Sequence, residues 1–209
     1  KNIIIHVDGV QAYGKLPYRI SQDIDLYSIS AHKINGLKGI GALIKRKNVN
    51  LTPIIFGGGQ ENGLRSGTEN VFGIKVFEYA GQEKYNNIKD YYIKTRKLKD
   101  IFLNGLNKDF FNIISGDNSS PYILSVSTKG IRGEVLMHAL EDQDLIVGNG
   151  SACSSKNRFS RVIEACGYTN EILDGIIRIS FSVYTTEEEC FKAVEIINNT
   201  VKKLKGILN

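Results

Sequence analysis

Lys33 stands among residues that suit a covalent reaction with a carbonyl compound. Ser30 and His32 precede it, and three glycines follow it in Gly36-Leu37-Lys38-Gly39-Ile40-Gly41. A lysine amine can form a Schiff base, and the neighbouring hydroxyl and imidazole groups can bind an anion beside it. Small residues also let a flat ligand approach the backbone closely. Alone, Lys33 would be an ordinary surface lysine, so the prediction of catalysis depends on these neighbours.

Two further segments carry polar residues beside predicted elements. Asp8 and Gln11 follow the apolar run Ile3-Ile4-Ile5. An aspartate is common where a strand gives way to a turn, so Asp8 has an ordinary structural explanation as well as a chemical one. Thr68 closes the segment Arg65-Ser66-Gly67-Thr68, just before a helical pattern, and the start of a helix attracts anions.

Arg178 interrupts an apolar strand pattern, Ile176-Ile177-Arg178-Ile179. A buried guanidinium without a partner is costly, so this arginine needs an anion. The partner is either a nearby Asp or Glu or the carboxylate of a substrate, held by two parallel hydrogen bonds. We favour the substrate.

The three cysteines favour a free reactive thiol. Their odd number and the lack of a C-x-x-C spacing argue against a disulfide framework and against a zinc site, so no metal is predicted. Cys153 lies among small polar residues in Gly150-Ser151-Ala152-Cys153-Ser154-Ser155, which favours an exposed loop over a small buried hydrophobe. Cys166 and Cys190 are expected to be buried and inert.

The composition is that of an ordinary globular protein. The 209 residues are 42% hydrophobic and 23% charged, and the net charge of +5 is scattered along the chain, which favours solvated faces over a nucleic-acid contact. No apolar run approaches the about 20 residues of a membrane span, and no signal-peptide pattern is present. We therefore expect a cytoplasmic protein. The first residue, Lys1, indicates a fragment or a processed product.

Periodicity predicts a mixed α/β fold with functional groups at the ends of strands. The first strand is expected to be buried and parallel. Thr185 and Glu188 are expected to form a capping box at the start of the closing helix. The predicted strands are 2–7, 26–30, 40–44, 122–127, 145–147 and 176–181, and the predicted helical segments are 69–106, 134–140 and the closing residues after 185.

Taken in order, these motifs resemble the aminotransferase class V family, and most closely its NifS/IscS-type cysteine desulfurases, which are pyridoxal-phosphate enzymes of fold type I. The resemblance implies the C-terminal half of a fold-type I large domain followed by a small α+β C-terminal domain. It implies a partial cofactor-binding domain at 1–85, a linking helix at 86–105 and the small domain at 106–209. The family has further chain before residue 1, so this polypeptide is expected to be truncated and, alone, to bind the cofactor poorly and turn over slowly or not at all.

The resemblance also implies roles around pyridoxal 5'-phosphate. Lys33 would hold the cofactor covalently and move the α-proton of the substrate. Asp8 would keep the pyridine nitrogen protonated, which makes the ring an electron sink. Gln11 would hydrogen-bond the ring oxygen, and Ser30 and His32 would bind the phosphate.

The remaining implied roles concern the substrate and the partners. Thr68 would reach the cofactor phosphate of the second subunit of a homodimer, and Arg178 would hold the carboxylate of L-cysteine. Cys153 would attack the substrate sulfur, leaving a persulfide and L-alanine. A sulfur-acceptor protein, either an iron-sulfur scaffold or a tRNA-thiolation enzyme, would then take the sulfur. Gly9 stands where alanine is more usual in the family, and this exchange is expected to be harmless.

Two other interpretations stay open. One is another class V activity, such as selenocysteine lyase or an aminotransferase, and an essential Cys153 would argue against the aminotransferase. The other is a non-catalytic fragment that serves dimerisation or partner binding. In that case substitution of Lys33 or Cys153 should leave partner binding intact.

Overall fold

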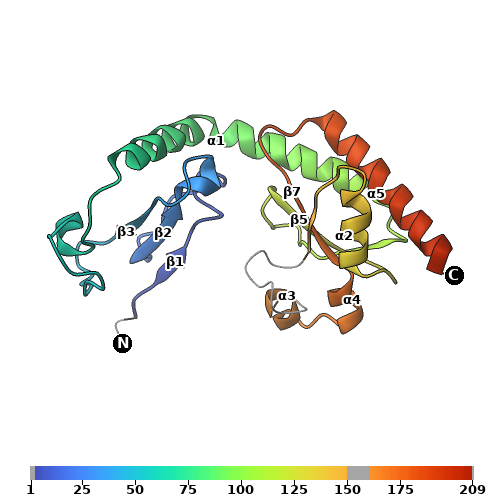
Figure 1. Cartoon of the computed structure of the whole chain (residues 1–209), viewed down its shortest axis with the longest axis horizontal. Coiled ribbons are helices and arrows are strands. Elements are labelled where there is room, and N and C mark those ends of the chain that lie inside the picture. The colour runs from blue at the N-terminus through green and yellow to red at the C-terminus, as the bar shows by residue number, and fades with distance from the viewer. Residues whose placement is uncertain (1–2, 150–160, 209) are drawn as a thin grey trace. The chain divides into compact units, whose positions relative to one another are not determined.

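A computed structural model describes residues 3–149 and 161–208. The chain forms two compact units, Lys1–Tyr92 and Ile93–Asn209 (Figure 1). The long helix α1 (Val71–Gly105) contains the boundary between them. In the described part of the chain, none of the helices is long and apolar enough to cross a membrane.

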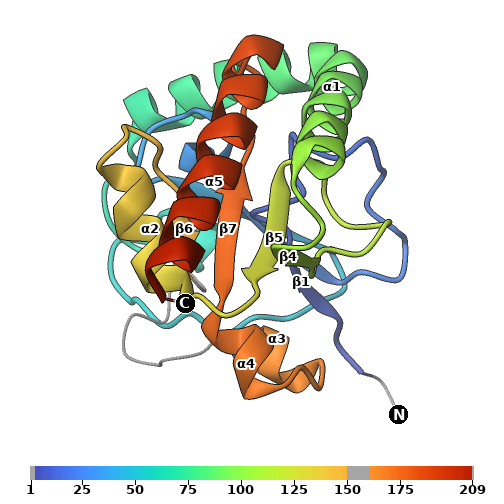
Figure 2. The ribbon, with the colours of Figure 1, turned by 90° about the vertical axis from the view of Figure 1, so that its right-hand side faces the viewer.

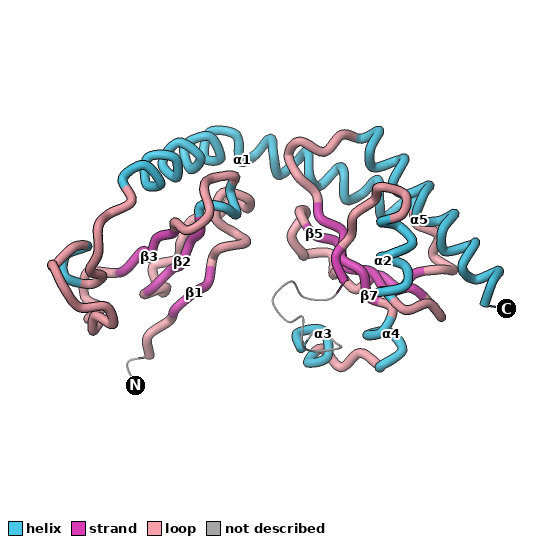
Figure 3. Tube along the Cα trace, viewed as in Figure 1, coloured by secondary structure: helices cyan, strands magenta, loops and turns pink. Residues whose placement is uncertain are grey.

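The first unit contains a three-stranded sheet of mixed direction (Figure 3). The central strand, β2, pairs in parallel with β1 and antiparallel with β3. A short 3-10 helix, η1, lies between β2 and β3, and a second, η2, lies in the long connection from β3 to α1. The bounds of these elements are β1 (His6–Asp8), β2 (Leu26–Ser30), η1 (Ala31–Ile34), β3 (Gly41–Lys45) and η2 (Glu61–Gly63).

The prediction of a buried strand at 2–7 is wrong in its bounds and its burial. The strand β1 begins at His6, and Ile3 and Ile4 are 75% and 56% exposed. The chain still approaches the sheet before the strand begins, because the Ile5 carbonyl accepts hydrogen bonds from the backbone N–H groups of Asp25 and Leu26. The strand thus follows the apolar run and does not contain it, and burial depends on what covers the strand.

The second unit is built on a four-stranded antiparallel sheet of order β4-β5-β7-β6. The strand predicted at 145–147 is displaced, because the residues that pair with β7 are Gly148 and Asn149. The strands are β4 (Phe111–Ile113), β5 (Ile123–Thr128), β6 (Gly148–Asn149) and β7 (Ile176–Ser180). The helices are α2 (Gly133–Glu141), α3 (Arg161–Ala165), α4 (Asn170–Asp174) and α5 (Glu187–Leu208).

One face of this sheet supports the main hydrophobic core. Figure 2 shows α2 and α5 lying over the sheet, and both helices share the core cluster with β5 and β7. Side chains alternate between the two faces of a strand. In β7, Ile177 and Ile179 therefore enter the core, whereas Arg178 lies on the opposite face.

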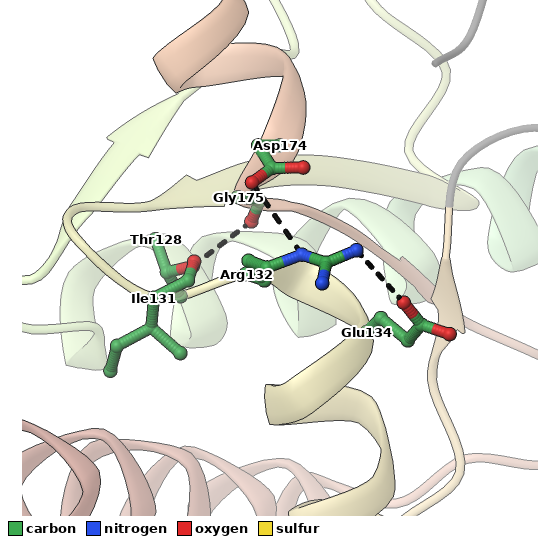
Figure 4. A network of polar contacts seen from close by, with 6 residues as sticks. All are labelled: Thr128, Ile131, Arg132, Glu134, Asp174 and Gly175. Atoms are coloured by element: carbon green, nitrogen blue, oxygen red, sulfur yellow. Dashed lines mark hydrogen bonds and ion pairs between the residues drawn. The ribbon is translucent and has the colours of Figure 1, made fainter. Parts of the chain in front are cut away.

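A polar network fixes the point at which β7 begins (Figure 4). The Oγ1 of buried Thr128, at the end of β5, lies 2.5 Å from the Ile131 carbonyl oxygen and 3.1 Å from that of Gly175. Arg132 lies 3.6 Å from Asp174 and 3.2 Å from Glu134, a charged contact at the surface. Ion pairs at the surface contribute little, so the buried hydroxyl is the stronger restraint.

The capping box of α5 is one residue later than predicted. Thr186, not Thr185, donates its backbone N–H to Glu189 at 2.7 Å, and the backbone N–H of Glu189 donates to Thr186 Oγ1 at 3.2 Å. Thr185 instead accepts a hydrogen bond from the backbone N–H of Ser182. The tripeptide Glu187-Glu188-Glu189 satisfies the sequence pattern in either register, and the preceding turn selects the later one.

The hydrogen bonds from Thr186 lower the pKa of Glu189 below its ordinary value of 4.5. We expect Glu189→Gln to lower the free energy of unfolding at neutral pH, because the native state favours the ionised carboxylate. This contribution is present above pH 4.5 and is lost as the pH falls through the native pKa, so the two proteins should converge in acid. Urea unfolding followed by circular dichroism measures the difference, with Glu188→Gln as the matched control. A difference that stays constant into acid would contradict the assignment.

Candidate active site

Five predicted site residues lie at one edge of the sheet in the first unit. The strands β1 and β2 run parallel, so their carboxyl ends meet at the same edge. Asp8 ends β1 and Gln11 lies in the turn that follows. Ser30 ends β2, and His32 and Lys33 follow it directly in η1. The sheet therefore gathers a carboxylate, an amide, a hydroxyl, an imidazole and an amine in one region.

Lys33 lies in a loop that is closed at its base. The backbone N–H of Ala31 donates to the Ile40 carbonyl at 3.1 Å, which joins the two ends of the loop. Asn35 follows η1 with a left-handed backbone (φ 71°) and turns the chain back. Lys33 itself is half-buried. A closed loop holds a nucleophilic amine at a defined position relative to the neighbouring strand ends.

Ser30 and His32 present two polar atoms side by side. Ser30 Oγ lies 2.8 Å from His32 Nδ1, and the His32 side chain is exposed. Ser30 has an extended backbone and lies immediately before η1, so its side chain and that of His32 point to the same region. One hydrogen bond joins these two atoms, and the donor that remains in the pair, the His32 Nε2–H or the Ser30 hydroxyl according to the tautomer, can bind an anionic group.

Gly9, the residue after Asp8, packs against the buried ring of Tyr27. Asp8 Oδ1 accepts a hydrogen bond from the backbone N–H of Val10 at 3.1 Å, and the Tyr27 hydroxyl donates to the Gly9 carbonyl at 3.5 Å. Burial, the charge of Asp8 and the nearby Tyr13 together raise the pKa of Tyr27. A Cβ at Gly9 would lie only 1.8 Å from the ring carbon Cζ of Tyr27. Glycine fits beside this ring, whereas the alanine that is more usual in the family would not.

Thr68 lies in an exposed loop that leads to α1. The Ser66 backbone N–H donates to the Ile55 carbonyl at 3.2 Å, and that of Gly67 donates to Gln60 Oε1 at 3.1 Å. These contacts hold the loop before the helix begins at Val71. The threonine hydroxyl is thus placed on the surface of the first unit, outside the group of five residues.

Arg178 belongs to the second unit, in the middle of its sheet. It pairs with Ser125 of β5 on one side and with Gly148 of β6 on the other. A Cβ at Gly148 would lie 3.0 Å from the Arg178 Nη2, so the guanidinium extends across the space that a side chain there would fill. The need for a glycine at position 148 was not predicted from the sequence. It depends on the register in which β6 pairs with β7, and the residue types do not encode that register.

Lys15 is a second residue that sequence reasoning missed. Its Nζ donates a hydrogen bond to Gln11 Oε1 at 2.7 Å. The i,i+4 spacing in a turn was the signal available in the sequence.

The cysteines differ from the expectation in one case. Cys190 is buried as predicted, with 1% exposure, and burial raises its thiol pKa to about 11. Cys166 is exposed, so its predicted burial is wrong. It follows the five-residue helix α3, outside the hydrophobic core. Cys153, the predicted nucleophile, lies outside the described residues. Among residues 3–149 and 161–208, no cluster of His, Cys, Asp and Glu side chains suits a metal ion.

The aminotransferase class-V family model matches residues 1–192. This chain belongs to that family. The cysteine desulfurase IscS of Neisseria meningitidis is 40% identical over 99% of this chain, and that of Dictyoglomus turgidum is 34% identical over 99%. These alignments cover 52% and 54% of the two relatives, so the chain spans about half their length.

Solved structures agree with the fold of this class V chain. A NifS-like protein superimposes with a TM-score of 0.87 at 36% identity, covering 96% of this chain and 53% of that one. A NifS-like protein from Rickettsia africae gives 0.83 at 30% identity, covering 97% and 54%. The α/β fold class, corresponding to part of a fold-type I pyridoxal-phosphate enzyme, is confirmed. Proteins of this family depend on pyridoxal 5'-phosphate, which confirms the cofactor prediction.

The donor set at the sheet edge of the first unit fits this cofactor. The cofactor has an aldehyde, a phosphate, a pyridine nitrogen and a ring oxygen. Lys33 supplies an amine for the aldehyde, and the pair Ser30 and His32 supplies a donor for the phosphate. Asp8 supplies a carboxylate for a protonated ring nitrogen, and Gln11 an amide for the ring oxygen.

The close approach of Tyr27 to Gly9 predicts a large effect of a small substitution. Gly9→Ala should lower the free energy of unfolding by about 1–3 kcal/mol, because the new methyl group overlaps the buried ring. Urea denaturation measures the loss, which should shrink in a Tyr27→Leu background. Gly116→Ala is the control, since a Cβ there meets nothing within 4 Å and the residue lies outside the helices. Equal stability of Gly9→Ala and the unsubstituted chain would contradict the packing.

The two described thiols should differ sharply in reactivity. Cys166 should react with iodoacetamide in the native protein, whereas Cys190 should react only after unfolding, because burial and its pKa of about 11 leave little thiolate. Peptide mapping by mass spectrometry after a short exposure measures both sites. Cys166→Ser removes the native-state signal and serves as the control. Labelling of Cys190 at a rate similar to that of Cys166 would disprove its burial.

Proposed function

We propose that this chain contributes to a pyridoxal-phosphate-dependent cysteine desulfurase, which converts L-cysteine to L-alanine and forms a persulfide on Cys153. The observation that carries the proposal is the gathering of Asp8, Ser30, His32 and Lys33 at one sheet edge. The names of the relatives, cysteine desulfurases at 34–40% identity, support it. In this proposal residues 1–85 belong to the large domain, 86–105 form the linking helix and 106–209 form the small domain.

The residues of the first unit would bind the cofactor and move protons. Lys33 would hold the cofactor through its amine and carry a proton to and from the substrate Cα. The Asp8 carboxylate would keep the ring nitrogen protonated, and Gln11 would donate to the ring oxygen. Ser30 and His32 would bind the phosphate. When bound, pyridoxal phosphate supplies an electron sink for the bonds that break at the substrate.

Two other residues would act on the substrate. Arg178 would bind the α-carboxylate of L-cysteine through its planar guanidinium. The Cys153 thiolate would attack the substrate sulfur. A sulfur–sulfur bond forms as the bond between the sulfur and Cβ breaks, and its electron pair remains with the carbon, which takes up a proton. Cysteine and an enzyme thiol thus give alanine and an enzyme persulfide, with no external oxidant or reductant.

The proposal also includes a second subunit and a protein that accepts the sulfur. Thr68 would contact the cofactor phosphate of a second subunit, which requires a homodimer. A sulfur-acceptor protein in the cytoplasm, an iron-sulfur scaffold or a tRNA-thiolation enzyme, would receive the persulfide sulfur. The scattered positive charge gives no reason to propose direct nucleic-acid binding.

The test is a single incubation with two readouts. The chain is mixed with pyridoxal phosphate and L-cysteine, the Cys153 peptide is examined by mass spectrometry for an added sulfur, and alanine is quantified. One turnover suffices for the persulfide signal, so a slow reaction is still detected. Because the chain alone is expected to bind the cofactor poorly, we expect only slow formation of both products, and we expect Lys33→Ala to lower alanine release by at least about 100-fold, the contribution of a positioned acid–base group.

The controls separate the desulfurase from its alternatives. Cys153→Ser should abolish the persulfide. Alanine from selenocysteine but not from cysteine would favour a selenocysteine lyase. Absence of both products, with Lys33→Ala and the unsubstituted chain behaving alike, would overturn the proposal for this chain and favour a non-catalytic partner-binding fragment.

A further inference from the structure

Gln11 and Lys15 lie on the same side of a tight turn after β1. The Tyr13 backbone N–H donates to the Gly9 carbonyl at 2.9 Å, and that of Leu16 donates to the Ala12 carbonyl at 3.0 Å. Both are hydrogen bonds of the α-helical kind, between residues four apart. Residues at positions i and i+4 of such a turn are neighbours, which brings the two side chains together.

The hydrogen bond between the two side chains can run in only one direction, from Lys15 to Gln11. Lys15 Nζ lies 2.7 Å from Gln11 Oε1. An ammonium group can donate hydrogen bonds and has no acceptor, so the amide oxygen must face it. The amide group is planar, with its oxygen and nitrogen on separate arms. The Nε2–H₂ group of Gln11 is therefore directed away from Lys15 and presents donors.

Lys15 lies in a cluster of cations. Lys84, on α1, is 4% exposed, lies 2.9 Å from Glu83 and stacks 4.8 Å from the centre of the Tyr91 ring. Burial, together with the charges of Lys33 and Lys84, lowers the pKa of Lys15. The charges of Lys33 and Lys84 thus both act on the Lys15 ammonium group, in the unit that holds the candidate cofactor site. Such a cluster favours a ligand with negative charge.

We propose that Lys15 is a positioning residue for the cofactor: it orients the Gln11 amide so that Nε2–H₂ is the donor offered to the anionic ring oxygen. This inference rests on the proposed function, because it takes the ligand of Gln11 to be pyridoxal phosphate. The alternative is that Lys15 and Gln11 form an ordinary surface pair that supports the turn. The two explanations differ in what happens when Gln11 is removed.

A double-mutant cycle on the 209-residue chain makes that distinction. Pyridoxal phosphate is titrated, borohydride fixes it to lysines, and peptide mapping quantifies the adduct at Lys33. Lys15→Met should weaken apparent cofactor binding by about 3- to 10-fold, the value of one ordered hydrogen bond. In a Gln11→Ala background the same change should have less than about a twofold effect. Lys15→Met and Gln11→Ala should also shift the absorption maximum of the bound cofactor in the same direction.

Two further variants act as matched controls. Lys15→Arg keeps the charge and has only donors, so it should retain the binding of the unsubstituted chain within about twofold. Lys38→Met removes one positive charge from the exposed part of the loop that carries Lys33 and does not touch Gln11, so it should leave the absorption maximum unchanged. Circular dichroism melting verifies that each variant folds.

A measurement without cofactor tests the structural half of the inference. Nuclear magnetic resonance of the Gln11 side-chain amide should report an ordered group in the unsubstituted chain and a more mobile one in Lys15→Met. Unchanged order would overturn the proposal even if Lys15→Met lowered cofactor binding.

The remaining outcomes are also decisive. If Lys15→Met weakened cofactor binding equally with and without Gln11, Lys15 would not act through the amide. That result would overturn the inference, and the proposed function would stand. No adduct at Lys33 in the unsubstituted chain, or adducts at Lys15 in its place, would overturn the proposed function and this inference together.

Discussion

The parallel pairing of β1 with β2 is the constraint on which the candidate site depends. Antiparallel strands would send Asp8 and Ser30 to opposite edges of the sheet, whereas the parallel pair brings both carboxyl ends to one edge. The residues that follow the two strands then lie at the same edge, with Gln11 after β1 and Lys33 after β2. The antiparallel strand β3 returns the chain and closes the loop that contains Lys33.

Tight packing beneath this edge limits what the sequence can vary. The Tyr27 ring occupies the space beside Gly9, so the residue after the proposed ring-nitrogen partner has no room for a side chain. The hydroxyl group of Tyr27 also donates a hydrogen bond to the Gly9 carbonyl, which connects the turn after β1 to β2. The turn that follows Asp8 is thus held by a buried aromatic residue, and a change in Gly9 or Tyr27 affects the other.

The sequence predicted the elements better than their details. The strand at 26–30 and the long helix after residue 69 follow from apolar periodicity, which is a local property. The capping box of α5 and the strand after residue 147 were displaced by a residue or more, because neighbouring positions satisfy the same pattern and tertiary contacts choose between them. Burial was the least predictable property. The exposure of Ile3 and Cys166 depends on what packs over a segment, and the segment does not encode this.

In the candidate site, too, some features were predictable from the sequence and others were not. Residue types and order identified Lys33 and its neighbours, since the chemistry lies in the side chains themselves. Lys15 was not predicted as a site residue, because a lysine four residues from a glutamine is common. Whether the two side chains meet depends on the turn that joins them. The roles of these residues remain predictions, because placement at one edge is necessary for a shared ligand but does not identify it.

In the second unit, the hydrophobic core itself determines where Arg178 points. Alternation along β7 sends Ile177 and Ile179 into the core under α2 and α5, so the residue between them must face the other side of the sheet. Gly148 on the adjacent strand leaves space for the guanidinium. The buried Thr128 hydroxyl, which lies 3.1 Å from the Gly175 carbonyl oxygen, fixes the start of the strand two residues before Arg178. The packing that stabilises the unit thus also orients the cation, and a one-residue slip in register would turn Arg178 into the core.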